Sequence, residues 1–276
     1  MLVSEEIYTK IRDLLYKSSR INLGPDKKQL VMTRLNKRIQ FLGLDSFEDY
    51  WEHVSKLDRS GSSDELGFLV DSLTTNYTKF FREPMSLDYF RDHIIPSLLK
   101  EKYREKISVW SSACSTGEEP YTLAIILAEA MERNHTTRWE ITGTDISRRV
   151  LETASSGIYP TDNIGISNPT FLKKYFLKGK EKSAGKCRVK KELRDNLKFM
   201  HLNLFDQTYP FTEKFDVIFC RNVMIYFDRQ TQKQLVERLV SWLNPHGYLV
   251  IGSSESITGM SDKLTSIKPT IYQYTR

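Results

Sequence analysis

Residues 109–121 read VWSSACSTGEEPY, and they join the end of an apolar strand to the beginning of a helix. The apolar run Ile107–Trp110 predicts the strand, and a turn-rich loop of small residues follows it. Two adjacent glutamates and a proline are typical of the first turn of a helix, so we expect the next helix over Glu118–Met131. A strand that passes through such a loop into a helix is the repeating unit of an α/β fold.

The chain beyond this loop continues to alternate between strands and helices. Ser147 is positioned to cap a helix that ends before Gly157, and Gln230–Leu243 has the apolar spacing of an amphipathic helix. The further predicted strands are Trp139–Thr144, Leu197–Leu204, Phe215–Cys220 and Tyr248–Gly252. This alternation predicts an α/β fold, a doubly wound Rossmann-like domain with a mainly parallel sheet.

The stretch from Tyr159 to Asn196 interrupts the alternation with short, charged, β-prone pieces. Its predicted strands, Tyr175–Leu177 and Cys187–Lys190, lie on either side of a glycine-containing turn. We therefore expect a small antiparallel β subdomain, inserted at about residues 159–196. Ten lysines and arginines lie within Lys173–Arg194. Such a patch could contact nucleic acid, acidic lipid or an acidic protein, or it could keep an exposed hairpin soluble.

The first quarter of the chain has the apolar spacing of helices and contains no candidate catalytic residue before Thr75. The predicted helices are one around Ile7–Leu15, one with Pro25 in its first turn that ends before Gly43, one capped by Ser46, and one near Glu65–Leu73. We therefore expect a small all-helical N-terminal domain over residues 1–74. A linker or lid would follow over residues 75–92, and the α/β domain would occupy residues 93–276.

The length and composition are those of an ordinary folded protein. The 276 residues are 39% hydrophobic and 28% charged, which argues against disorder. No apolar run approaches the roughly 20 residues needed to cross a bilayer, so we expect a cytoplasmic protein. Cys114, Cys187 and Cys220 are far apart and have no metal-ligand spacing. We therefore expect neither disulfides nor a bound metal.

The loops beyond the carboxyl ends of the strands hold the candidate binding residues, because doubly wound sheets bind ligands there. The loop after Trp110 lacks the GxGxxG pattern. Glu118 and Glu119 would repel a pyrophosphate but attract a cationic amino group or a sulfonium, which favours S-adenosylmethionine over NAD. They could equally stabilise the helix dipole. Asp145, at the end of the next strand, could accept both ribose hydroxyls or cap the following helix.

Two further loops and one segment before the sheet contain candidates. Asn203-Leu204 pairs an amide with an apolar side chain, which suits an adenine ring but is also common in strand-end turns. Arg221-Asn222 follows a buried strand, and a buried arginine needs an acidic partner, for which a bound amino acid carboxylate is one candidate. Residues 75–84, TNYTKFFREP, could form a lid over a ligand. Alternatively, Phe80 and Phe81 could pack between the domains, and Arg82 could pair with Glu83 or another acid.

Taken together, these segments resemble the chemotaxis receptor glutamate O-methyltransferase family. The matching stretches are TNYTKFFRE (75–83), VWSSACSTGEEPY (109–121), GTDI (143–146), SGIY (156–159), Asn203-Leu204, FDVIFCRNVMIYFD (215–228) and GSSE (252–255). The resemblance implies a helical N-terminal domain joined to an S-adenosylmethionine-dependent α/β domain with an inserted three-stranded β subdomain. It also implies methyl transfer to receptor glutamates, with S-adenosylhomocysteine as the product.

Carried over by position, the resemblance implies a cofactor site drawn from several segments. The residues expected to bind S-adenosylmethionine are Asn76, Thr78, Arg82, Glu118, Glu119, Asp145, Asn203, Leu204, Arg221 and Asn222. One of the two adjacent glutamates would bind the methionine amino group, and Asp145 would bind the ribose. Arg82 and Tyr226 are expected beside the transferring methyl group as the catalytic residues.

The expected partner is the cytoplasmic helical bundle of a chemotaxis receptor, so the protein would be recruited to membrane receptor arrays without inserting into the membrane. A basic face on the second helix is a plausible docking surface, formed by Lys27, Lys28, Arg34, Lys37 and Arg38. In some members of the family the β subdomain also binds a peptide at the receptor's C-terminus. The competing interpretations are an RNA or small-molecule methyltransferase and a non-catalytic cofactor-binding sensor. We expect no nucleic-acid partner, because the sequence lacks an RNA-reading module.

Overall fold

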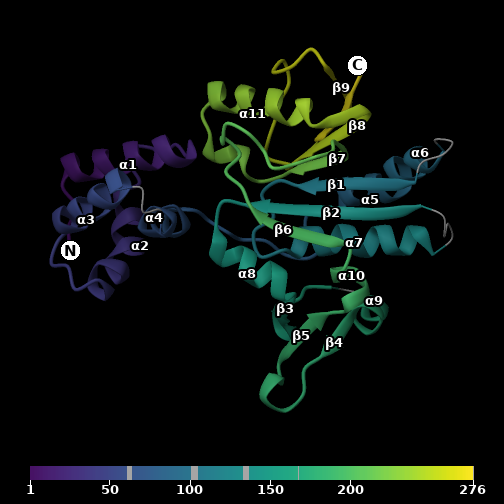
Figure 1. Cartoon of the computed structure of the whole chain (residues 1–276), viewed down its shortest axis with the longest axis horizontal. Helices are drawn as coiled ribbons and strands as arrows, with labels where there is room; N and C mark the ends of the chain where they lie inside the picture. The colour runs from purple at the N-terminus through teal and green to yellow at the C-terminus, as the bar shows by residue number, and fades with distance from the viewer. Residues whose placement is uncertain (61–63, 101–104, 133–136, 167, 276) are drawn as a thin grey trace.

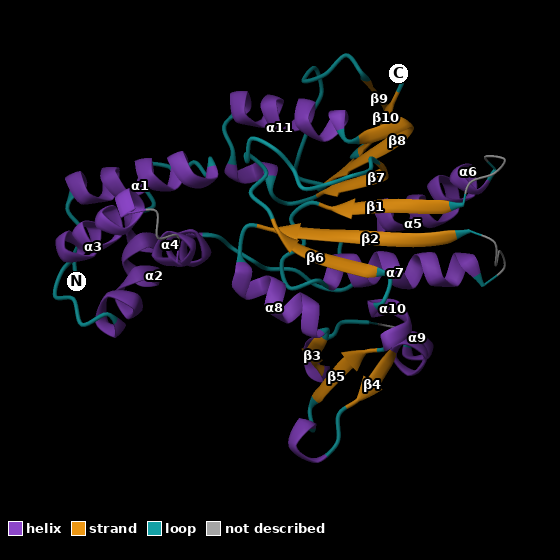
Figure 2. Cartoon of the chain, viewed as in Figure 1, coloured by secondary structure: helices purple, strands orange, loops and turns teal. Residues whose placement is uncertain are grey.

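The structure, a computed structural model, describes residues 1–60, 64–100, 105–132, 137–166 and 168–275. Within these residues, helices at the N-terminus precede a domain built on a seven-stranded sheet, and a separate three-stranded sheet extends from that domain (Figures 1 and 2). The N-terminal helices are α1 (Glu5–Ser19), α2 (Lys28–Phe41), α3 (Phe47–Ser60) and α4 (Asp64–Leu73). The predicted fold class is confirmed. No helix in the described part of the chain is long and apolar enough to cross a membrane.

The start of α2 differs from the prediction. Pro25 does not lie in the first turn of the helix but in a turn before it, in which the Lys27 amide donates to the Gly24 carbonyl at 3.3 Å. The Tyr8 hydroxyl of α1 donates to the same carbonyl. Proline suits the second position of such a turn as well as the first turn of a helix, so the sequence was compatible with both arrangements. The contact with α1 selects the turn.

The main sheet has the strand order β6-β2-β1-β7-β8-β10-β9. Its parallel strands are β1 (Lys106–Ser111), β2 (Arg138–Asp145), β6 (Leu197–His201), β7 (Phe215–Cys220) and β8 (Leu243–Ile251). The chain winds outward from β1 through β2 to β6 and then crosses to β7 on the other side of β1. The direction of winding therefore reverses between β1 and β7, which is where doubly wound sheets bind their ligands.

Helices and other elements cover both faces of the sheet. On one face, Trp110 and Ile218 share a core with Leu235 of α11 (Arg229–Ser241) and with the N-terminal helices. On the other, Val109 and Phe219 share a core with α7 (Glu118–Met131). All six residues of β7 are buried, as expected of a strand covered on both sides. Helix α8 (Arg148–Ser156) follows β2 and is capped as predicted by the Ser147 hydroxyl, which accepts from the Val150 amide.

Two groups of elements were not predicted from the sequence. A helical stretch follows residue 83 and comprises α5 (Pro84–Tyr89), the π-helical turn η1 (Phe90–Ile94) and α6 (Ile95–Leu99). Pro96 lies within it, so an uninterrupted α-helical pattern was not to be expected. At the other end, β9 (Leu264–Lys268) and β10 (Ile271–Tyr274) are antiparallel edge strands. Four of the five residues of β9 are exposed, so it lacks the alternation that identifies a half-buried strand.

The inserted subdomain contains the predicted antiparallel sheet. Its strands, in the order β3-β5-β4, are β3 (Ile158–Pro160), β5 (Lys186–Val189) and β4 (Phe176–Lys178). The segment also includes α9 (Pro169–Tyr175), α10 (Lys191–Arg194) and the short 3-10 turns η2 (Thr161–Asn163) and η3 (Glu181–Ser183). Among the described strands of this sheet, β3 and β4 pair only with β5, so each has one free edge.

Candidate active site

A cavity of about 990 Å³, including its solvent-filled mouth, lies beyond the carboxyl ends of β1, β2, β6 and β7. Its walls also include Ser19 and Ile21 at the end of α1 and the segment that begins at Thr74. The cavity therefore coincides with the reversal point of the sheet and draws on both the helical and the α/β parts of the chain.

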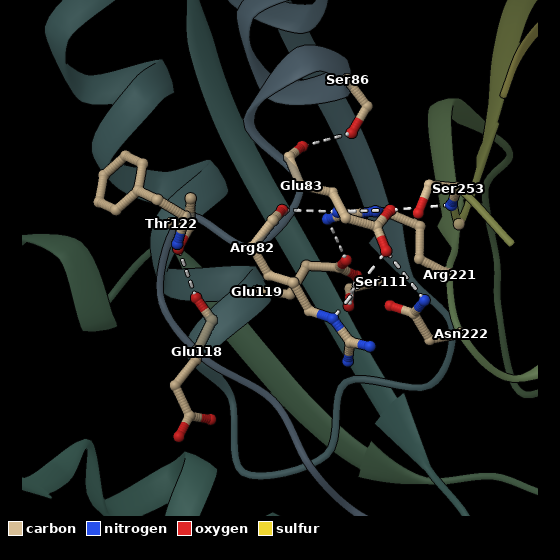
Figure 3. Close-up of polar contacts among 12 residues, drawn as sticks. Arg82, Glu83, Ser86, Ser111, Glu118, Glu119, Thr122, Arg221, Asn222 and Ser253 are labelled. Atoms are coloured by element: carbon tan, nitrogen blue, oxygen red, sulfur yellow. Dashed lines mark hydrogen bonds and ion pairs between the residues drawn. The ribbon is translucent and has the colours of Figure 1, made fainter. Parts of the chain in front are cut away.

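Every predicted site residue lines this cavity except Glu118. Those that do are Asn76, Thr78, Arg82, Glu119, Asp145, Asn203, Leu204, Arg221, Asn222 and Tyr226. The Glu118 carboxylate instead accepts a hydrogen bond from the Thr116 hydroxyl at 2.6 Å and points away from Arg82 and Glu119 (Figure 3). Burial raises the pKa of Glu118, and the Thr116 hydrogen bond only partly offsets this. Of the two adjacent glutamates, Glu119 alone contributes to the cavity wall.

Glu119 faces the cavity as part of an ionic cluster with Arg221. Its carboxylate accepts hydrogen bonds from the Ser111 hydroxyl at 2.7 Å and from Arg221 Nη1 at 2.9 Å. Arg221 Nη2 donates to the Arg82 carbonyl at 2.6 Å and to Glu83 Oε2 at 3.2 Å. The buried Arg221 side chain therefore has two protein carboxylates as partners, where the sequence had left a bound carboxylate as one candidate. Arg82 Nε also lies 4.0 Å from Glu83 Oε1, so two guanidiniums and two carboxylates make up the cluster and their charges balance.

Asp145 ends β2 with its carboxylate against two backbone amides. Oδ2 accepts from the Ser115 amide at 2.8 Å, and Oδ1 accepts from the Ser147 amide at 2.9 Å. Burial raises the pKa of Asp145 to about 6, against the lowering effect of these hydrogen bonds. Each carboxylate oxygen has more than one acceptor position, so the side chain can both organise the two loops and accept hydroxyl groups from a ligand.

Asn203 lines the cavity, but its amide is already hydrogen-bonded. Nδ2 donates to the Ser18 carbonyl of α1 at 2.7 Å, and Oδ1 accepts from the Phe205 amide at 3.0 Å. β6 ends at His201, earlier than predicted, because the chain turns around this side chain. The strand-end turn weighed as an alternative is thus present, while Leu204 contributes an apolar wall beside it.

The lid segment both lines the cavity and packs into the core. Phe80 is buried and meets Tyr159 and Phe176 edge to face, with ring centroids 5.1 and 5.6 Å apart, so it packs against β3 and β4 of the inserted subdomain and not against the N-terminal helices. Arg82 Nη1 donates to the Tyr77 carbonyl at 2.8 Å. Packing of the phenylalanine therefore anchors the segment while the arginine remains at the cavity wall.

Tyr226, the second candidate catalytic residue, lies in the short 3-10 turn η4 (Met224–Tyr226). Its hydroxyl donates to the Thr75 carbonyl at 3.3 Å, and its own carbonyl accepts from the Asn22 amide at 2.8 Å. This tyrosine therefore connects the loop after β7 with the beginning of the lid and with the chain after α1.

Sequence reasoning considered Glu83 only as a partner of Arg82, with which it does form an ion pair at 4.0 Å, and it assigned no role to Glu255, although both stand in matched motifs. Glu255 accepts hydrogen bonds from the amides of Asn222, Met224 and Gly252 at 2.9, 2.7 and 2.6 Å. It thereby organises the loop after β7 from the far side. Burial raises the pKa of Glu255, and these amides partly offset the rise. The sequence signal that could have identified Glu255 is a carboxylate soon after an apolar strand, the same signal that identified Asp145.

Several residues around the cavity have left-handed backbone conformations. Among the described residues, Phe81, Glu83, Ser115 and Asn222 have φ angles of 53°, 55°, 49° and 59°. Such angles are unfavourable for residues other than glycine and persist only where the surrounding contacts fix them. The loops of the site are therefore held in defined conformations rather than in the most relaxed ones.

The residues present fit S-adenosylmethionine. Asp145 offers acceptors for a ribose, Leu204 offers an apolar surface for a ring, and the Glu119 carboxylate at the cavity wall offers an acceptor for a cationic amino group. The amides of Asn203 and Asn222 and the guanidinium of Arg221 already make hydrogen bonds within the protein.

Comparisons with known proteins agree with this architecture. A family described as "CheR methyltransferase, SAM binding domain" matches residues 76–273, and "CheR methyltransferase, all-alpha domain" matches residues 6–74. The chain is 38% identical to the chemotaxis protein methyltransferase of Borreliella burgdorferi, over 98% of this chain and 95% of that protein. It is 37% identical to that of Salmonella typhimurium, over 99% and 91% respectively. It is also 38% identical to chemotaxis protein methyltransferase 2 of Pseudomonas aeruginosa, over 98% and 93%.

Proposed function

Because the chain belongs to the CheR methyltransferase family and is an S-adenosylmethionine-dependent chemotaxis protein methyltransferase, we propose that its acceptors are specific glutamate side chains of chemotaxis receptors. The products would be glutamate methyl esters and S-adenosylhomocysteine, and the reaction would serve sensory adaptation. The protein would act from the cytoplasm on receptors gathered in membrane arrays.

The chemistry of the cavity wall supports a carboxylate acceptor. An acceptor such as a hydroxyl or an amine would need a base to remove a proton, whereas a glutamate with a pKa of about 4.3 is already ionised at neutral pH. Among the described residues that line the cavity there is no histidine, and Glu119 is held in an ion pair with Arg221. Arg82, at the same wall, offers a cation that can orient an incoming carboxylate.

We assign alignment rather than acid–base chemistry to the two candidate catalytic residues. S-adenosylmethionine supplies a methyl group on a sulfonium, and transfer to a carboxylate removes both charges, so exclusion of water favours the reaction. Arg82 would orient the acceptor carboxylate or close over the cofactor. The hydroxyl of Tyr226, close to the Thr75 carbonyl, would fix the position of the lid beside the reacting groups.

The basic face of α2 is a smaller docking surface than its five charges suggest. Arg38 forms an ion pair with the buried Glu65 at 2.5 Å, and Lys28 contacts Glu5. Arg34 Nη1 donates to the carbonyls of Ser72 and Thr74 at 3.2 and 2.6 Å, which ties α2 to the start of the lid. Exposed charges that remain for an acidic receptor surface are those of Lys27 and Lys37.

Charge reversal tests this docking proposal. Replacing Lys27 and Lys37 by glutamate should slow receptor methylation by roughly tenfold at low salt, with a smaller effect at high salt, because surface charges chiefly steer encounter. Affinity for S-adenosylhomocysteine should not change. Lys56→Glu on α3, also an exposed lysine of the helical region, is the matched control. Equal receptor methylation by the double variant and the wild type at low salt would contradict the proposal.

We further propose that the β subdomain binds the C-terminal peptide of a receptor. The free edges of β3 and β4 could each accept an extended strand, and Lys178 and Lys186 expose positive charge on the same sheet. Removal of the receptor's last residues should then reduce its methylation at low receptor concentration. Unchanged methylation of the shortened receptor would count against a tether.

The decisive experiment for the acceptor is transfer of labelled methyl groups to membranes that carry chemotaxis receptors, followed by mild alkali. Carboxyl methyl esters release volatile methanol under these conditions, whereas N-methyl groups and RNA base methyl groups do not. Alkali-labile label on the receptor supports the proposal. Label on RNA or on a small molecule would indicate a different acceptor, and cofactor binding without any transfer would indicate a sensor.

A further inference from the structure

We infer that Glu83 is a positioning residue that fastens the turn bearing Arg82 to the sheet. This inference rests on the proposed function, because the role of Arg82 at the reacting groups belongs to that proposal. Glu83 itself is not among the residues that line the cavity. Any effect it has on the reaction must therefore act through its neighbours.

The Glu83 carboxylate collects donors from two loops that are distant in sequence (Figure 3). Oε1 accepts from Asn222 Nδ2 at 3.0 Å, and Oε2 accepts from Arg221 Nη2 at 3.2 Å and from the Ser253 amide at 2.9 Å. Asn222 follows β7 and Ser253 follows β8, so one side chain joins the lid to the ends of two adjacent strands. Burial alone would raise the pKa of Glu83, but the Asn222 hydrogen bond and the charge of Arg221 bring it below its ordinary value.

The same contacts fix the backbone on both sides of Arg82. Phe81 and Glu83 both have left-handed φ angles, which reverse the chain around Arg82. The Phe81 amide donates to Thr122 Oγ1 at 3.0 Å, and the Arg82 carbonyl accepts from Arg221 Nη2 at 2.6 Å. A backbone conformation of this kind persists only when it is held from outside. Glu83 supplies that hold by pairing with the arginine that binds the Arg82 carbonyl.

The consequence is that the direction of the Arg82 side chain depends on a carboxylate one residue away. Without Glu83, the Phe81–Glu83 turn can relax toward ordinary backbone angles, and the Arg82 guanidinium moves relative to the cavity. Displacements of about 1 Å in a catalytic group are sufficient to lower turnover strongly. A purely structural residue, by contrast, would lower stability without acting through Arg82.

The test is a double-mutant cycle with Glu83→Gln and Arg82→Ala. In either rotamer the glutamine NH2 would face a donor, Asn222 Nδ2 or the Arg221 and Ser253 groups, and the variant keeps the shape of the side chain but loses the charge that pairs with Arg221 and Arg82. We expect Glu83→Gln alone to lower kcat or S-adenosylhomocysteine affinity about tenfold or more, in the same direction as Arg82→Ala does. In the Arg82→Ala background, Glu83→Gln should lower the same kcat or affinity by less than about twofold, because the effects of coupled residues are not additive. Asp88→Asn, at an exposed ion pair on α5, is the control.

Each measured outcome decides between the possibilities. The inference would be overturned if Glu83→Gln kept the wild-type kcat and affinity. It would also be overturned if Glu83→Gln lowered either quantity a full tenfold in the Arg82→Ala background. If Glu83→Gln does not fold, Glu83→Asp, which keeps the charge on a shorter side chain, enters the same cycle. Affinity for S-adenosylhomocysteine, measured by calorimetry, needs no acceptor. The proposed acceptor can therefore fail, with no label on receptors, while the coupling of Glu83 to Arg82 is still decided by the binding data.

Discussion

The pH dependence of cofactor binding should be governed by Asp145. Burial raises its pKa from 3.8 to about 6, and a difference of this size corresponds to roughly 3 kcal/mol. Since the folded value lies above the unfolded one, the folded protein holds a proton between about pH 4 and pH 6 that the unfolded chain releases. The contribution of this group to stability is therefore greatest at low pH, falls as the pH rises through that window and is constant above it.

Cofactor binding should show the opposite dependence. Ribose hydroxyls that donate to Asp145 require the ionised carboxylate, so binding must first remove the proton when the pH is below about 6. We expect the Kd of S-adenosylhomocysteine to be nearly constant from about pH 7 to 8 and to rise by about tenfold per pH unit below about pH 6. Isothermal titration calorimetry from about pH 5 to pH 8 measures this directly, with the proton release on binding obtained from buffers of different ionisation enthalpy.

Asp145→Asn isolates the group responsible. Its amide would place a donor against the amide of Ser115 or Ser147, and it would lose charge-assisted hydrogen bonds to the ligand, so affinity at neutral pH should fall about 10- to 100-fold. The steep loss of affinity below about pH 6 should disappear with the carboxylate. The exposed Asp195→Asn is the matched control and should change neither quantity. Wild-type affinity in Asp145→Asn, or an unchanged slope at low pH, would refute this account of the site.

Two further substitutions test the loop between β1 and α7. Glu119→Gln removes the partner of Arg221 and should weaken S-adenosylhomocysteine binding about 10- to 100-fold, whereas Glu118→Gln should weaken it less than about threefold. Calorimetry of both proteins measures these affinities. Equal effects would contradict the placement of Glu119 alone at the cavity wall. Gly117→Ala should lower the free energy of unfolding by about 2 kcal/mol or more, because φ of Gly117 is +95° and the new Cβ would lie 3.0 Å from Ala154 Cα. A denaturant midpoint equal to that of the wild type would contradict this prediction.

Local patterns in the sequence predicted the elements whose signals are themselves local. The helix Glu118–Met131 begins and ends where the glutamate pair and the apolar spacing placed it, and β7 matches its continuous apolar run. The order of strands and helices followed in the same way, and with it the position of the site at the carboxyl ends of the strands. The N-terminal helices α1, α3 and α4 also lie close to their predicted positions.

Elements that depend on distant contacts could not be predicted in this way. The exposed strand β9 exists because β10 pairs with it, and the turn at Pro25 exists because Tyr8 binds the carbonyl before it. The shorter β6 reflects the contact of Asn203 with the end of α1. In each case the residues carry a weak or ambiguous local signal, and pairing with another element decides the outcome.

The sequence by itself determined the fold class, the family and most of the residues around the cavity, because strand–loop–helix units place their loop residues at one edge of a parallel sheet whatever the details of packing. Only the tertiary structure decided which of two adjacent glutamates faces the cavity, that Arg221 pairs with Glu83 and Glu119, and that three of the five basic residues of α2 have partners within the protein. Ionic and hydrogen-bond partners are chosen by proximity in space, and a buried charge accepts whichever opposite charge the fold brings within reach.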